Sequence, residues 1–191
     1  AEMLLANPIS SELDAMRPSM LGNLILAVGR NVDRGHDDIS LFEVGPQYLN
    51  PTPKGQTFVA AGVRRGRNAR RHWADQPRTV DAYDAKADAI AALEAIGAPT
   101  ASMQVAAAAP AWYHPRRSGV MRLGPKNVLA AFGEIHPQIL DRMDVTGPLM
   151  AFEVFIDNAP QPKAKASRNR DKLLVSHLPS VQRDFAFVVD E

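Results

Sequence analysis

The sequence predicts an α+β fold in which a few helices flank a mostly antiparallel sheet. Stretches of strand length recur along most of the chain, and connections rich in Gly, Pro and Asn separate several of them. Helical apolar spacing is confined to a few segments, of which residues 81–96 form the clearest. Neither an internal repeat nor a long low-complexity tract interrupts this pattern, so we expect one main domain.

Composition limits the classes of protein to consider. The chain has 191 residues, and 22 Lys and Arg against 21 Asp and Glu leave a formal net charge of +1. A hydrophobic share of 46% and a charged share of 23% are ordinary for a globular domain, which excludes bulk disorder and nucleic-acid binding by overall charge. The absence of cysteine excludes disulfides, thiolate nucleophiles and cysteine-ligated zinc, and it fits a cytoplasmic protein.

The sequence shows neither a membrane span nor a complete start. Its apolar runs are far shorter than the roughly 18 residues that a membrane helix needs, so we expect no membrane association. Position 1 is not Met, and the chain stops where a strand-like pattern ends. We therefore expect a piece of a longer protein.

The first long element is a helix that begins after Pro18, because proline pre-sets the backbone of a first helical turn. Apolar side chains recur in it at spacings of three and four residues, so the helix needs a partner surface. Gly22 and Gly29 weaken the helix itself, which means that packing must hold it. The apolar stripe consists of Met20, Leu21, Leu24, Ile25 and Val28.

The rest of the main domain is expected to be built from strands and two further helices. Strand patterns cover residues 3–6, 39–49, 57–63, 103–107, 119–123, 128–135 and 149–157. Gly45-Pro46 is expected to break or bulge the strand at 39–49. Helices are expected at 138–143 and at 81–96, where Tyr83, Ala87, Ile90, Leu93 and Ile96 share one face.

The composition changes near residue 159. Residues 159–172 hold two prolines, five basic residues and almost nothing apolar, which is typical of a linker. We expect a main domain at 1–158, a basic linker at 159–172 and the truncated, weakly held start of another domain at 173–191.

Several kinds of chemistry have no signal in the sequence. The five histidines lie far apart, and no pair has metal-ligand spacing, so no metal site is expected. The glycine-rich and nucleophile motifs of P-loop, dinucleotide-binding and serine-hydrolase proteins are missing as well. We therefore predict no catalytic residue.

A basic loop, residues 64–73, is the densest charge feature. Its arginines and Trp73 could grip RNA phosphates and stack a base. The alternative, which we favour, is a solvated hairpin with Trp73 packed against the body. The candidate RNA contacts are Arg64, Arg65, Arg67, Arg70 and Arg71.

Two further features carry open alternatives. The segment 112–117, which joins Trp and Tyr to a His-Pro turn and two arginines, describes either the mouth of a ligand site or a packed turn. Glu43, Glu134 and Glu153 lie inside apolar strands, where a carboxylate must pair, ligate or face solvent. Strand alternation makes solvent the default expectation for all three.

Several stretches together resemble the β subunit of bacterial phenylalanyl-tRNA synthetase, in the order of that family and over nearly the whole chain. They are residues 7–12 (Asn-Pro-Ile-Ser-Ser-Glu), 16–21 (Met-Arg-Pro-Ser-Met-Leu), 41–45 (Leu-Phe-Glu-Val-Gly), 80–88, 114–118 (His-Pro-Arg-Arg-Ser), 132–137 (Phe-Gly-Glu-Ile-His-Pro) and 178–189. The departures are Gly22-Asn23 where the family usually has Pro-Gly, and Leu178 and Gln182 where an aromatic residue and Arg are common.

The resemblance implies a class II synthetase-like core that is itself non-catalytic, followed by the first strand of a ferredoxin-fold anticodon-binding domain. Two arginines hold ATP in catalytic cores of this class, but the matching strand here carries Leu41-Phe42-Glu43. No Gly-x-Gly-x-x-x-Arg pattern follows Phe152-Glu153-Val154. Adenylation with ATP and Mg²⁺ is thus expected in a separate α subunit of an α2β2 heterotetramer that acts on tRNA(Phe), with no cofactor in this chain.

Three functions follow from this reading, in the order we favour. In the first, the chain packs against the α subunit and the stripe Met20–Val28 belongs to the subunit interface. In the second, it is an adenylate-forming enzyme with an unusual clamp. In the third, it is an independent RNA-binding module that uses the loop Arg64–Arg71.

Overall fold

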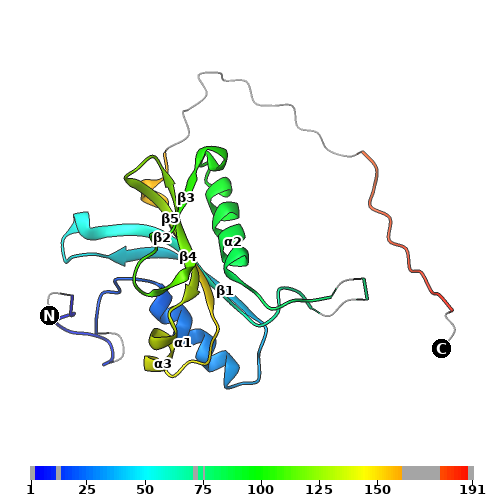
Figure 1. Cartoon of the computed structure of the whole chain (residues 1–191). Coiled ribbons are helices and arrows are strands. Elements are labelled where there is room, and N and C mark those ends of the chain that lie inside the picture. The colour runs from blue at the N-terminus through cyan, green and yellow to red at the C-terminus, as the bar shows by residue number, and fades with distance from the viewer. Residues whose placement is uncertain (1–2, 12–13, 71–72, 75, 161–176, 189–191) are drawn as a thin grey trace.

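The computed structural model describes residues 3–11, 14–70, 73–74, 76–160 and 177–188. They form a six-stranded antiparallel sheet in the order β1-β2-β6-β5-β4-β3, with helices on both faces (Figure 1). The predicted α+β fold is therefore confirmed. The strands are β1 (Ile39–Tyr48), β2 (Gln56–Arg65), β3 (Gln104–Ala106), β4 (Tyr113–Leu123), β5 (Asn127–Ile135) and β6 (Met150–Phe155), and the helices are α1 (Leu21–Val32), α2 (Ala82–Ala95) and α3 (Pro137–Arg142). Single 3-10 turns lie at Pro53–Gly55, Thr100–Ser102 and Ile156–Asn158.

Helices α1 and α3 cover one face of the sheet. All five side chains of the α1 stripe are 0–6% exposed, and they pack with Val59, Ala61 and Val63 of β2. The surface that the stripe requires is therefore the sheet of the same chain. Hydrophobic burial of this kind holds α1 in place although it contains Gly22 and Gly29.

Helix α2 covers the opposite face, where it packs against β5 and β6. A capping box starts it: the side chain of Asp81 accepts hydrogen bonds from the amides of Tyr83 and Asp84, and Asp84 accepts one from the amide of Asp81. The buried side chains are Ala85, Ala89 and Leu93, whereas Tyr83 is 76% exposed. The predicted buried face was wrong in this respect, because small alanines let the helix approach the sheet closely.

Strand β1 continues through Gly45-Pro46, so the predicted break was wrong. Pro46 pairs in register with Phe58, and the Pro46 carbonyl accepts a hydrogen bond from Arg17 Nε at 2.9 Å on the side away from β2. The missing N–H of Pro46 therefore faces the outer edge of the sheet, where no ladder bond is lost.

A bulge interrupts the pairing of β4 with β5 between Tyr113 and Ser118. Opposite it, Gly133 has φ +143°, and a Cβ there would collide with the Arg117 carbonyl and with Ser118. Glycine is required at this position because both the conformation and the space exclude a side chain.

The two ends of the chain carry little regular structure where they are described. Residues 3–6 form only a single bridge, Leu4 to Ala15, in place of the predicted strand. Residues 177–188 are exposed and contain neither helix nor strand. The remainder of the predicted segment 173–191, and residues 161–172 of the predicted linker, lie outside the described residues. Within the described part, no helix has the length and apolar character to span a membrane.

Candidate functional site

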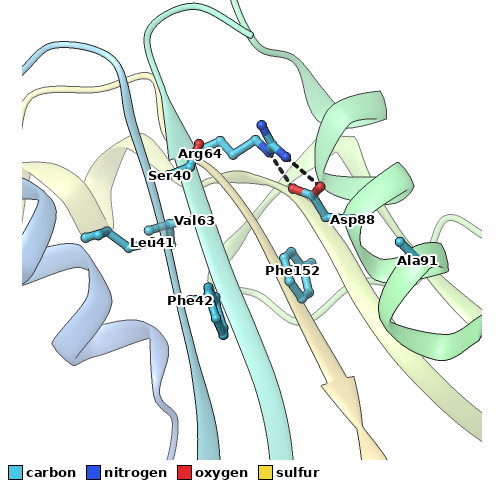
Figure 2. A pocket seen from close by; sticks show the side chains of 8 residues that line it. All are labelled: Ser40, Leu41, Phe42, Val63, Arg64, Asp88, Ala91 and Phe152. Atoms are coloured by element: carbon cyan, nitrogen blue, oxygen red, sulfur yellow. Dashed lines mark hydrogen bonds and ion pairs between the residues drawn. The ribbon is translucent and has the colours of Figure 1, made fainter. Parts of the chain in front are cut away.

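A small hollow of about 220 Å³ lies between strands β1, β2 and β6 and helix α2 (Figure 2). It includes Leu41 and Phe42, at the strand where the sequence predicts that a phosphate clamp is missing. Binding sites for small molecules typically have about 300–1,000 Å³. The hollow is therefore smaller than a site for a nucleotide.

Arg64 is the cation of this hollow, and an acidic partner holds it. Its Nε and Nη2 donate to the two carboxylate oxygens of Asp88 on α2, at 2.5 and 2.7 Å (Figure 2). The hydrogen bond to Asp88 raises the pKa of Arg64 above its ordinary value. A guanidinium in a two-pronged contact of this kind could hold a phosphate only after breaking it.

The ring of Phe152 occupies the sheet surface next to Arg64. A Cβ on Gly62, the residue that pairs with Phe152, would lie 2.5 Å from Cε1 of that ring. The aromatic ring therefore lies over the bare backbone of β2. This part of the face is filled by the protein's own side chain, while Phe42 beside it is 78% exposed.

The other arginines of the basic loop are divided between partners and solvent. Arg65 Nη1 lies 3.1 Å from the carboxylate of Asp37, and Arg67 Nε lies 3.3 Å from that of Asp38. Arg70 is exposed, and Arg71 lies outside the described residues. Trp73 is 92% exposed, so it does not pack against the body as the favoured interpretation expected.

A buried carboxylate, Glu153, joins three elements on the α1 face. It is 1% exposed and accepts hydrogen bonds from Ser19 Oγ (2.9 Å), Trp112 Nε1 (3.1 Å) and Tyr113 Oη (3.2 Å). Burial raises its pKa, an effect that these three donors reduce, and burial also raises the pKa of Tyr113. Ser19 Oγ also accepts from the amide of Leu21, so Glu153 fixes the start of α1.

Solvent was the wrong expectation for two of the three strand carboxylates. Glu134 is 8% exposed and accepts two hydrogen bonds from the guanidinium of Arg117, and Glu153 is the buried group described above. Glu43 is partly exposed and pairs with Arg17 at 2.5 Å. The sequence alone does not connect Trp112 and Tyr113 with Glu153. In the structure both donate hydrogen bonds to its carboxylate.

An apolar groove of about 250 Å³ runs between α1 and α3. Its walls include Leu21 and Ile25 of the stripe, Ile139 of α3, Met143 at the end of α3, and Trp112. Leu21 and Ile25 are buried, and Trp112 and Met143 are the more exposed walls of the groove. Among the described residues, no three His, Asp or Glu side chains gather as metal ligands would.

Comparison with solved structures defines the class of fold. Two structures of pyrrolysyl-tRNA synthetase from Desulfitobacterium hafniense match with TM-scores of 0.55 and 0.54, at 14% and 15% identity. The first match covers 79% of this chain and 49% of the other. At this identity the likeness concerns the fold alone, and the fold is that of a class II aminoacyl-tRNA synthetase core.

Sequence comparison then gives the family. A family profile described as the phenylalanyl-tRNA synthetase beta chain CLM domain matches residues 1–156, and the chain belongs to this family. The phenylalanine–tRNA ligase beta subunit of Rhodospirillum rubrum is 58% identical over 98% of this chain, and that of Mesorhizobium japonicum is 52% identical over 98%. The chain spans only 23% and 24% of these two relatives.

Proposed function

We propose that this chain is a non-catalytic core of the beta subunit of phenylalanyl-tRNA synthetase, the enzyme that attaches phenylalanine to tRNA(Phe). Its role is to support a separate catalytic α subunit in an α2β2 assembly in the cytoplasm, and ATP and Mg²⁺ act in that α subunit. The observation that carries the proposal is the hollow beside α2. Its arginine is bound to Asp88 and its floor is occupied by Phe152, which leaves neither a free cation nor the space for a triphosphate.

Contact with the α subunit is proposed at the groove between α1 and α3. The stripe from Met20 to Val28 holds α1 on the sheet, and the groove leaves an apolar strip between that helix and α3. An apolar side chain of the partner would bury this strip, as in the core of a stable interface. The stripe thus serves the interface by positioning the groove.

Two measurements test the proposal. Pyrophosphate exchange with phenylalanine and ATP should give no turnover with this chain alone and full turnover with the assembled enzyme. Co-purification should place the chain with the α subunit, and Met143→Asp in the groove should weaken that association while Arg30→Asp on the exposed end of α1 leaves it unchanged. Turnover by the chain alone would favour the adenylate-forming alternative, and an unaffected Met143→Asp complex would exclude the groove.

A further inference from the structure

Two His-Pro turns with the same hydrogen bond lie side by side at one end of the sheet, and the proposed function uses neither. His114-Pro115-Arg116 is in strand β4, and His136-Pro137-Gln138 follows β5. In each turn the histidine Nδ1 accepts a hydrogen bond from the backbone N–H two residues later, at 3.1 Å from Arg116 and 3.2 Å from Gln138. The two imidazole rings stack, with centroids 6.3 Å apart and planes inclined by 26°.

These hydrogen bonds fix the tautomer of both rings. A nitrogen that accepts a backbone N–H carries no proton, so the proton of each neutral imidazole is on Nε2. His114 and His136 are both partly exposed. The stack therefore offers two Nε2–H donors, held on rings that their own turns orient.

A guanidinium belongs to the same turn as the first histidine. The side chain of Arg116 is exposed, and among the described residues it makes no ion pair with a carboxylate. Two carboxylates of strands β5 and β6 already have donors: Glu134 is bound by Arg117, and Glu153 is buried beneath Trp112. The positive charge of Arg116 is thus available to a ligand.

We propose that the paired His-Pro turns bind a phosphate group, with Nε2–H of His114 and of His136 and the guanidinium of Arg116 as donors. The ring centroids are 6.3 Å apart, which is close enough for donors on the two rings to reach different oxygens of one phosphate. A phosphate offers several acceptor oxygens and a negative charge, so it suits two N–H donors and one cation. The group belongs either to a free phosphate compound or to an RNA backbone.

The first test is a titration of the protein with inorganic phosphate, followed by NMR signals of the histidine rings. The signals of both rings should shift together and saturate. Arg116→Gln should weaken binding about tenfold, because a hydrogen bond to a charged group is lost, whereas Arg30→Gln on α1 makes the same charge change elsewhere and should have no effect.

A second pair of variants separates binding from folding. His114→Asn and His136→Asn keep a side-chain oxygen that accepts the backbone N–H of the turn, but remove the Nε2–H donor. Each should leave the unfolding midpoint in urea nearly unchanged and weaken phosphate binding about tenfold. Shifts that are equal in wild type and in both Asn variants would overturn the proposal.

A short single-stranded RNA distinguishes the two sources of phosphate. If the ligand is an RNA backbone, the oligonucleotide should bind more tightly than inorganic phosphate, and Arg116→Gln should reduce the slope of log K against log salt by about 0.7. Equal or weaker binding of the RNA would assign the site to a free phosphate compound. Ring signals that respond neither to phosphate nor to RNA would refute the site, whatever becomes of the proposed role as a non-catalytic core.

Discussion

Removal of the carboxylate of Glu153 should abolish three hydrogen bonds at once, those from Ser19, Trp112 and Tyr113. In Glu153→Ala the hydroxyl of Tyr113 keeps its burial and loses its acceptor, which costs about 1–3 kcal/mol. Ser19 and Trp112 are partly exposed and can turn to water, so their lost bonds add less, about 0.5–1 kcal/mol each. We expect Glu153→Ala to lower the free energy of unfolding by about 2–5 kcal/mol.

Glu153→Gln is the matched control. One oxygen of Glu153 accepts from both Trp112 and Tyr113, and the other accepts from Ser19, whose hydroxyl can also accept. A glutamine can therefore turn its oxygen toward the two aromatic donors and its NH₂ toward Ser19. It also removes a buried charge that has no cation among its hydrogen-bond partners, so we expect its effect to stay within about 1 kcal/mol of wild type.

The pH dependence gives an independent check. Burial raises the pKa of Glu153 above the ordinary glutamate value of 4.5, so the folded state holds this proton to a higher pH than the unfolded chain does. The contribution of Glu153 to stability is then fully present below pH 4.5 and is lost as pH rises through its folded pKa. The free energy of unfolding of wild type minus that of Glu153→Gln should therefore decrease with rising pH.

Urea unfolding followed by tryptophan fluorescence, at a series of pH values, measures both effects. The slope with urea should be the same in all three proteins, since the change is in stability alone. If Glu153→Gln and Glu153→Ala lower the free energy of unfolding equally, the stabilising effect of Glu153 does not come from these hydrogen bonds. A wild-type advantage that grows with pH would contradict the assigned direction of the pKa shift.

The same unfolding assay tests two local features. Gly133→Ala should cost about 3 kcal/mol or more, because its φ of +143° disfavours a side chain and Ser118 occupies the space. Gly124→Ala, at φ +68° with open space around it, should cost only about 1–2 kcal/mol, and equal losses would show that the collision is relieved. Asp81→Ala should cost about 1 kcal/mol through the lost cap of α2, and Asp81→Asn should keep most of that stability. A loss in Asp81→Asn as large as in Asp81→Ala would assign it to the carboxylate charge and not to the cap.

The sequence predicts the elements of this fold better than their contacts. The helix at 81–96 and most strands from 39 onward lie within a few residues of α2 and of the observed strands, because periodic patterns and turn residues act locally. The exception is β4, which begins at Tyr113 and not at Gly119. The buried face of α2 was misassigned because periodicity ranks Tyr83 above Ala85, whereas close packing on a sheet favours the smaller residue. The strand at 3–6 failed because an isolated apolar run has no partner of sufficient length.

The candidate sites depend on long-range contacts that spacing does not reveal. Asp88 is 24 residues from Arg64, and Ser19 is 134 residues from Glu153, so neither pairing has a signature in the sequence. The His-Pro dipeptides at 114 and 136 are a visible signal. Their stacking becomes predictable once β4 and β5 are recognised as neighbours.

The position of β6 in the sheet has a consequence for folding during synthesis. Among the described strands it is the last to be made, yet it lies between β2 and β5 and joins the hairpin of β1 and β2 to the strands β3 to β5. In a nascent chain that ends before Met150, no strand pairing joins β1 and β2 to β3, β4 and β5. Ser19 and Trp112 then lack Glu153, the acceptor of their hydrogen bonds. Strand β6 therefore both closes the sheet and supplies the acceptor, Glu153, that holds the start of α1.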